Sequence, residues 1–414
     1  MGAILVVLLA VVAVALARHP TLKTFSFTAW VFTLVAASMV WPSFFGTWFG
    51  YDLKGLIVPL VQIIMFGMGT KLSTADFVRV FVMPWPVFVG VTLHYTVMPI
   101  TGYAIAKLFG FPPEVAAGVI LIGSVSSGAA SNLMAFLARA NVALAVTVTA
   151  CSTLVSPLLT PFLMKTLAGR LVPIDFIKML LEILNMVIVP VASGLIANRI
   201  LFSNRPWAGR SSNLGLIAAG CLLAAFGIKM LIPAEIGVLG SLQSGATLGL
   251  ILIGVVACTK LLAGVVSGRP TVWMDRALPL ISMVGICLII AIITARSRDK
   301  LMTVGGALII AAILHNAVGY FCGYWLSRAL RLDEITCRTV AIEVGMQNGG
   351  MASGLAMSVL KSADAALAPA IFGPWMNISG SILASWWRKR PVVRPELASN
   401  TAPESASTAA EQRS

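Results

Sequence analysis

Two apolar stretches of the sequence are interrupted by polar side chains that could bind a cation. In the first, residues 122–132 read IGSVSSGAASN, which places serines and Asn132 inside an otherwise apolar run. In the second, residues 342–354 read IEVGMQNGGMASG, where Glu343, Gln347 and Asn348 lie among glycines. Glycine lowers helix stability by about 1 kcal/mol per site, so clustered glycines permit a helix to unwind. Both stretches are therefore candidates for a broken helix that carries a site.

Glu343 determines what kind of ion such a site could bind. A carboxylate at the centre of a bilayer costs at least about 2.5 kcal/mol, so it should face the protein interior and have a partner. No Lys or Arg is placed to pair with Glu343 in the same apolar stretch. One carboxylate with neighbouring amides and hydroxyls makes an oxygen cage that suits a hard monovalent cation such as sodium. The alternative is that the small residues only let helices pack closely.

The elements that must position these residues are membrane helices. Of 414 residues, 58% are hydrophobic and only 11% charged, which excludes a water-soluble globular chain. Apolar runs of about 17 to 25 residues, the length of a membrane-spanning helix, recur along the chain. We expect an all-α polytopic membrane protein with about thirteen transmembrane helices, near residues 2–17, 25–43, 54–71, 84–109, 113–138, 142–167, 174–201, 212–233, 243–267, 276–295, 302–329, 335–360 and 366–388.

The basic residues indicate an orientation rather than a nucleic-acid partner. The net charge is +14, but Lys and Arg fall at the ends of the apolar runs, where lipid headgroups attract them. They are more numerous on the side that would hold the C-terminus, so we expect a cytoplasmic C-terminus in the cell inner membrane. The first run, 2–17, could be a cleaved signal peptide, but it lacks a basic start and we expect it to be retained. The six cysteines are scattered singly and predict packing rather than disulfides.

One interrupted segment in each half of a membrane protein points to a transporter built from inverted repeats. The sequence resembles the bile acid:sodium symporter family in six stretches, which cover most of residues 25–202 and 275–388. They are IIMFGMGTKL (63–72), MPITGYAIAKLFGFPPEVAAGVILIGS (98–124), ASNLMAFLARANVALAVTVTACSTLVSPLLTPFL (130–163), ILHNAVGY (313–320), IEVGMQNGGMA (342–352) and NISGSILASWW (377–387).

The resemblance implies two inverted five-helix repeats, forming a panel and a core domain, with two broken helices that cross in the core. It also implies secondary active transport of an organic anion (bile-acid-like, a steroid conjugate or a small carboxylate), coupled to sodium by alternating access. The corresponding domains are an extra N-terminal helix (1–24), the first repeat with the first helix of the second (25–202), an inserted helical pair (203–274), the remainder of the second repeat (275–390) and a disordered cytoplasmic tail (391–414).

Carried over by position, the resemblance also implies site residues. The first sodium would bind Ser131, Asn132, Thr149 and Glu343. The second would bind the side chains of Glu343 and Gln347 and the backbone carbonyls of Val344 and Met346. The substrate would meet Asn348 and Asn377.

Several residues depart from the family pattern, including Ser126-Ser127-Gly128 at the first break, where the family has Pro-Gly-Gly. Ala145 replaces a serine of the first site, and Ala129 and Met376 stand where a threonine and a histidine line the substrate cavity. His94 replaces a glutamine of the second site, and its nitrogen is a poorer ligand for sodium than an amide oxygen. An unperturbed histidine titrates at about pH 6.5, so we expect a weak second site and a pH-dependent sodium affinity. The alternative is that His94 only hydrogen-bonds a neighbouring helix.

Other functions stay open at this point. A carrier of the same fold could use protons or work as an exporter, and a non-transporting membrane receptor or scaffold is a second class. We do not expect an enzyme, because Glu343 has no second carboxylate, zinc-binding pair or nucleophile motif beside it. The substrate's identity and the oligomeric state cannot be read from the sequence.

Overall fold

The computed structural model describes residues 2–19, 25–203, 206–233, 237–266, 274–390 and 392, which are helical almost throughout. The helices are α1 (Gly2–Arg18), α2 (Ser26–Val40), α3 (Ile57–Gly69), α4 (Thr74–Val82), α5 (Pro84–Phe109), α6 (Pro113–Ser124), α7 (Ala130–Leu137), α8 (Val142–Leu167), α9 (Phe176–Ile183), α10 (Val189–Phe202), α11 (Ser211–Leu231), α12 (Gly237–Thr259), α13 (Met274–Arg296), α14 (Arg298–Ala329), α15 (Glu334–Gly345), α16 (Gly349–Ser358) and α17 (Ala363–Arg388).

Short irregular elements join several of these helices. The π-helical turn η4 (Leu184–Ile188) makes α9 and α10 one continuous helix, and a second one, η6 (Lys260–Val266), extends α12. The 3₁₀ turns are η2 (Pro42–Phe45), η3 (Leu53–Leu56) and η5 (Pro206–Gly209). Within the described residues, the only strands are β1 (Thr47–Trp48) and β2 (Tyr51–Asp52), which pair antiparallel.

Local sequence explains where the important helices begin. The side chain of Asn141 accepts a hydrogen bond from the backbone N–H of Leu144 and so caps α8. Asp333 caps α15 in the same way through the N–H of Thr336. These caps satisfy backbone donors that have no partner within the helix. They fix the start of two helices that carry predicted site residues.

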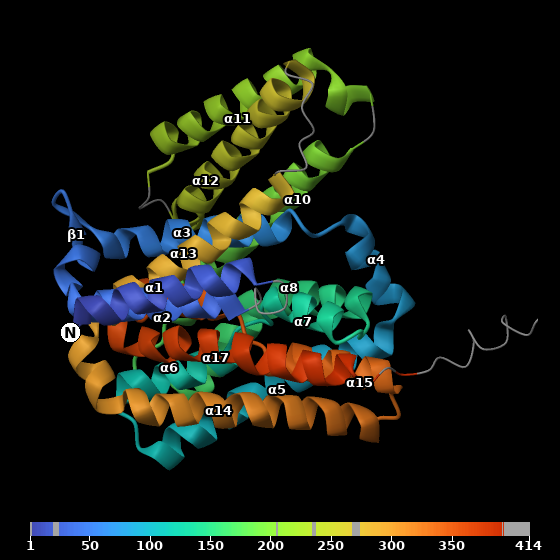
Figure 1. Ribbon diagram of the computed structural model, residues 1–414. Helices are drawn as coiled ribbons and strands as arrows, with labels where there is room; N and C mark the ends of the chain where they lie inside the picture. Colours follow the sequence, from blue (N-terminus) through green and yellow to red (C-terminus); the bar gives the residue numbers. More distant parts are fainter. Residues whose placement is uncertain are drawn as a thin grey trace, which may run out of the picture.

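The helices pack in two groups (Figure 1). The hairpin of α11 and α12 lies at one edge and packs through α12 on α10, which in turn packs on α3. Helix α13 contacts both α2 and α3, and α1 packs on α2. The second group comprises α5 to α8 and α14 to α17, with α17 against α6, α14 and α16. The broken pairs α6–α7 and α15–α16 both lie in this second group.

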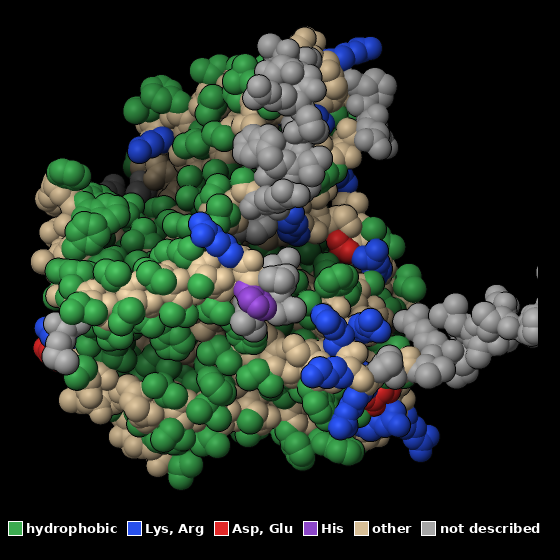
Figure 2. Space-filling view, viewed as in Figure 1, with side chains coloured by type: hydrophobic (Ala, Val, Ile, Leu, Met, Phe, Trp, Pro, Cys, Tyr) green, Lys and Arg blue, Asp and Glu red, His purple; other side chains and the backbone are tan. Residues whose placement is uncertain are grey.

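The outer surface is apolar, as a lipid-facing surface must be. Hydrophobic side chains cover most of the face in Figure 2, while Lys and Arg gather near the end of the molecule where α15 and α17 meet. Large apolar side chains are exposed along the helices, including Leu223 on α11 and Phe321 on α14. Buried polar residues are instead concentrated around the two helix breaks. The chain is a multi-pass membrane protein.

The count of spans differs from the expected thirteen. Among the described residues, six helices are long and apolar enough to cross a membrane, or seven if α3 and α4, bent by 65°, form one span. Predicted helices 113–138 and 335–360 are each two shorter helices with a break between them. Helix α4 is absent from the expected list, because nine residues are too few for a span.

Some of the expected regions fall partly or wholly outside the described residues. The tail, 391–414, does so apart from Val392, and so do residues 20–24 of the N-terminal segment. The expected inserted pair, 203–274, contains three such stretches, and its two helices otherwise agree with α11 and α12. The division into domains remains a prediction.

Candidate ion and substrate site

The two helix breaks cross and pair through their backbones. Residues 125–129 separate α6 from α7, and Met346 to Asn348 separate α15 from α16. The N–H of Gly128 donates to the carbonyl of Met346 at 3.1 Å, and the N–H of Asn348 donates to the carbonyl of Ser126 at 2.9 Å. Ser127 and Gln347 thereby form an isolated antiparallel β-bridge. This pairing satisfies backbone groups that the breaks release at membrane depth.

Gly128 is required for this close approach. A Cβ atom at position 128 would lie 2.6 Å from the backbone carbonyl oxygen of Gln347, which is too short for a real contact. The glycine therefore does more than loosen the helix, because it allows two backbones to touch.

The Glu343 carboxylate lies at this crossing and is fully buried. Its Oε2 accepts hydrogen bonds from the hydroxyls of Ser127 and Thr149, both at 2.8 Å. Its Oε1 accepts one from the hydroxyl of Ser131 at 2.5 Å. None of the ion pairs in the described part of the chain involves Glu343. The carboxylate is thus solvated by neutral hydroxyls and keeps its negative charge uncompensated if it is ionised.

The predicted first sodium site is largely brought together. Ser131, Thr149 and Glu343 are in direct contact, and Asn132 joins them because its Oδ1 accepts from the Thr149 hydroxyl at 3.4 Å. Ala145 is buried on α8, one turn before Thr149, and adds no oxygen. The site is therefore an oxygen cluster contributed by α7, α8, α15 and the first break.

The predicted second site is more crowded. The carbonyl of Val344 accepts from the Gln347 side-chain amide at 2.6 Å. The carbonyl of Met346 accepts from both the N–H of Gly128 and the hydroxyl of Ser127. The buried Oε1 of Gln347 has no hydrogen-bond partner among the described residues. A buried acceptor without a partner costs free energy of folding, which a bound cation would recover. This oxygen is the predicted ligand of the second site that forms no hydrogen bond with the described residues.

His94 on α5 connects the two broken helices rather than pointing at Gln347. Its Nδ1 lies 3.1 Å from the carbonyl oxygen of Glu343, and its Nε2 lies 2.8 Å from that of Val125. A neutral imidazole can donate to one of these oxygens and an imidazolium to both. The ring therefore holds one of these two carbonyls, near the ends of α6 and α15, when it is neutral, and both when it is charged.

The four predicted substrate residues lie in different surroundings. Asn348 is buried, caps α16 through its Oδ1, and directs its amide nitrogen to the sulfur of Met65 on α3 at 3.7 Å. The Met376 sulfur accepts from the N–H of Gln347 at 3.1 Å. Asn377 donates to the carbonyl of Gly373 in its own helix. Ala129 is exposed at the start of α7.

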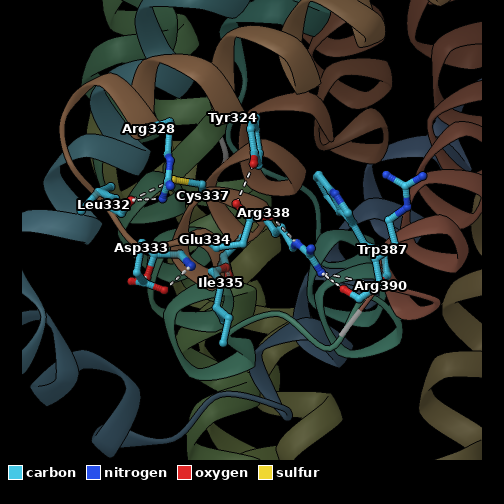
Figure 3. Close-up of polar contacts among 12 residues, drawn as sticks. Tyr324, Arg328, Leu332, Asp333, Glu334, Ile335, Cys337, Arg338, Trp387 and Arg390 are labelled. Atoms are coloured by element: carbon cyan, nitrogen blue, oxygen red, sulfur yellow. Dashed lines mark hydrogen bonds and ion pairs between the residues drawn. The ribbon is translucent and has the colours of Figure 1, made fainter. Parts of the chain in front are cut away.

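A polar cluster at the other end of α15 fixes the helix that carries Glu343 (Figure 3). The Arg338 guanidinium pairs with Glu334 at 2.8 Å and donates to the backbone carbonyls of Trp387 and Arg390 at the end of α17. The hydroxyl of Tyr324 on α14 donates to the second oxygen of Glu334 at 2.6 Å. Arg338 therefore joins α15 to the C-terminal end of α17.

Two contacts at the site were not assigned from the sequence. Ser127 was noted as one polar residue of the first break, but not as a partner of Glu343. No helical spacing identifies it, because Ser127 lies in the break between α6 and α7, and its contact with Ser131 depends on the path of the backbone there. Met65 carried no signal, since its approach to Asn348 depends on how α3 packs.

Fold and site together define a multi-pass helical membrane protein with an oxygen-lined site at two crossed helix breaks. The family described as the Sodium Bile acid symporter family matches residues 58–236. The chain is 32% identical to the uncharacterized sodium-dependent transporter YocS of Bacillus subtilis (strain 168) over 365 residues, which cover 88% of this chain and 91% of the relative. It is 29% identical to the probable chloroplastic sodium/metabolite cotransporter BASS1 of Arabidopsis thaliana, with 89% of this chain and 79% of the relative covered.

The chain therefore belongs to the sodium bile acid symporter family, as the six quoted stretches predicted.

Proposed function

We propose that this protein is a secondary active transporter that carries an organic anion together with sodium. The observation that carries the proposal is the Glu343 carboxylate, buried among the hydroxyls of Ser127, Ser131 and Thr149 and without a Lys or Arg partner in the described residues. A bound sodium ion would neutralise this charge where it lies. Hydroxyl oxygens keep free lone pairs while they donate, so the same groups can coordinate the ion. The names of the relatives, which are sodium-dependent or sodium/metabolite transporters, support the same ion.

In this proposal, sodium is a co-substrate with at least one site. The first site consists of Ser131, Asn132, Thr149 and Glu343, with Ser127 added by its contact with the carboxylate. A second ion would depend on the free Oε1 of Gln347 and on the carbonyls of Val344 and Met346, with His94 at its margin.

Alternating access would use the two groups of helices. We assign α2, α3, α10 and α13 to the panel domain and α5 to α8 with α14 to α17 to the core domain. Asn348 supports this assignment, because it belongs to the second break and contacts Met65 of α3 across the boundary between the groups. An organic anion bound at that boundary would lie beside the ion site and would contact both groups of helices as they move. We further propose an inner-membrane location with a cytoplasmic C-terminus.

Thermal unfolding of the purified protein in sodium and in potassium chloride at equal ionic strength tests the ion assignment. Sodium at 100 times its dissociation constant should stabilise the folded state by about 2.7 kcal/mol if it binds the folded state alone. Glu343→Ala should abolish the sodium effect, and Ser127→Ala, Asn132→Ala and Gln347→Ala should each weaken it through loss of an oxygen.

The matched control is Glu182→Gln, which changes another carboxylate within a membrane span, on α9. It should leave the sodium response unchanged. A wild-type protein that responds to acidification but not to sodium would instead be a proton-coupled carrier of the same fold. A protein that binds sodium but moves no solute in proteoliposomes would be a receptor or scaffold.

A further inference from the structure

A cavity of about 530 Å³ lies at the C-terminal end of α10, away from the helix breaks. It is formed by residues of α10, the start of α4 and the turn η5, which leads into α11. The residues that line it are Thr74, Asn198, Arg199, Phe202, Ser203 and Trp207. None of them was singled out by the sequence or is needed for the proposed ion site.

The chemistry of the lining favours an anion. Arg199 supplies a guanidinium group that forms no hydrogen bond or ion pair with the described residues, and none of the described residues that line the cavity is acidic. Asn198 beside it is held in place by a hydrogen bond from its amide to the carbonyl of Thr70 at 2.8 Å. The hydroxyl of Thr74 adds a neutral donor. Guanidinium and hydroxyl donors together are typical of phosphate recognition.

The C-terminus of a helix carries partial negative charge, which by itself would repel an anion from the end of α10. The ammonium group of Lys260, from η6, donates to the carbonyls of Ile200 and Leu201 at 2.6 and 3.2 Å. These carbonyls belong to the last turn of α10, so Lys260 offsets their charge beside the cavity. Two cations from separate elements thus make this helix end suitable for an anion.

The surroundings of the cavity favour a lipid over a soluble ligand. On α4, Asp76 is buried and paired with Arg79, whereas Val78, Phe81 and Val82 are 60%, 85% and 72% exposed. A short helix with one polar and one exposed apolar side lies along the membrane interface. The cavity walls also include Phe202 and Trp207, and tryptophan is enriched at headgroup level. The cavity therefore faces the zone where phospholipid headgroups lie.

We propose that this cavity binds the phosphate headgroup of an anionic phospholipid, with Arg199 as its principal contact and the two aromatic rings against the glycerol and upper acyl chain. A zwitterionic choline headgroup should bind more weakly, because it carries no net negative charge. The inference is independent of sodium coupling and of the transported solute.

Native mass spectrometry of the purified full chain tests the assignment, with phosphatidylglycerol and phosphatidylcholine added separately. We expect the wild type to retain one phosphatidylglycerol molecule in preference to phosphatidylcholine. Arg199→Gln should lower its apparent affinity about tenfold, the usual effect of losing one charged hydrogen bond. Arg199→Lys keeps the charge but not the two-pronged geometry of the guanidinium. Its apparent affinity for phosphatidylglycerol should lie between those of the wild type and Arg199→Gln.

Arg170→Gln is the matched control, since Arg170 is an exposed arginine that follows α8 and lies outside the cavity. It should bind phosphatidylglycerol as the wild type does. Thermal unfolding with inorganic phosphate distinguishes the source of the phosphate group. Equal stabilisation by phosphate and by phosphatidylglycerol would overturn the lipid assignment, as would equal retention of the two lipids. Unchanged phosphatidylglycerol binding in a folded Arg199→Gln protein would remove Arg199 from the site.

Discussion

Glu343 is held by hydroxyl groups, and this choice of partner determines what can bind. A hydroxyl carries one proton and two lone pairs, so it can donate to the carboxylate and still offer oxygen to a cation. A Lys or Arg in the same place would neutralise the carboxylate permanently. The three hydroxyls of Ser127, Ser131 and Thr149 therefore stabilise the buried group while leaving its charge available.

His94 gives the first residue-scale prediction. Its ring nitrogens already face the carbonyls of Val125 and Glu343, and nitrogen is a poor ligand for sodium. We expect wild-type transport to show a sodium Hill coefficient near one. His94→Gln replaces the ring nitrogens with an amide that carries an oxygen, a better ligand for sodium, and should raise this coefficient, as measured by solute uptake over a sodium titration in proteoliposomes.

The control for His94 is His315→Gln on α14. His315 is also buried and contacts a backbone carbonyl, that of Met98, but none of the predicted sodium ligands. It should leave the Hill coefficient unchanged. If His94→Gln lowers the thermal stability and leaves the coefficient at the wild-type value, the histidine only joins the two broken helices.

Three residues around Glu343, namely Ser131, Asn132 and Thr149, were predicted by position from the family resemblance. The residue types alone indicated only that a lone carboxylate in an apolar run needs polar partners. The partner Ser127 was missed because the choice among four neighbouring serines depends on the path of the broken backbone. Contacts such as Met65 with Asn348 depend on packing between helices that no local pattern specifies.

At the scale of the elements, Arg338 links the helix that carries Glu343 to its neighbours. It is buried, pairs with Glu334 and donates hydrogen bonds to the backbone carbonyls at the end of α17. We expect Arg338→Ala to lower the free energy of unfolding by about 2 kcal/mol, less than the ~3–5 kcal/mol of a fully buried pair because Glu334 keeps contact with solvent.

Thermal unfolding followed by tryptophan fluorescence measures this effect. Arg388→Ala is the control, because Arg388 is exposed in the last turn of the same α17. It should cost little. Equal melting temperatures for the two variants would show that the Arg338 cluster does not stabilise the helix.

The breaks in α6–α7 and α15–α16 were predicted as interruptions, but their pairing was not. Glycine and serine in an apolar run indicate that a helix can unwind, and this signal is local. The hydrogen bonds between Gly128 and Met346 join residues far apart in the chain, so only the tertiary fold reveals them. Helix α4 was missed because its nine residues are too few to give the apolar run of a membrane span.

At the scale of the whole molecule, the distribution of basic residues predicts an orientation. A reporter fused to the C-terminus should read as cytoplasmic, and one inserted after Ile232, at the end of α11, should read as external. Alkaline phosphatase and green fluorescent protein fusions measure this in cells. A cytoplasmic signal at both positions would mean that α11 and α12 do not each cross the membrane.

The backbone pairing at the crossing also has a consequence for biosynthesis. Ser127 and Met346 are 219 residues apart, so the first break enters the membrane long before its partner is synthesised. Until then, the N–H of Gly128 and the carbonyl of Ser126 lack their final partners in an environment without water. We therefore expect the insertion machinery to satisfy these groups in the nascent first half until α15 and α16 are made, so that the two halves complete their folding together.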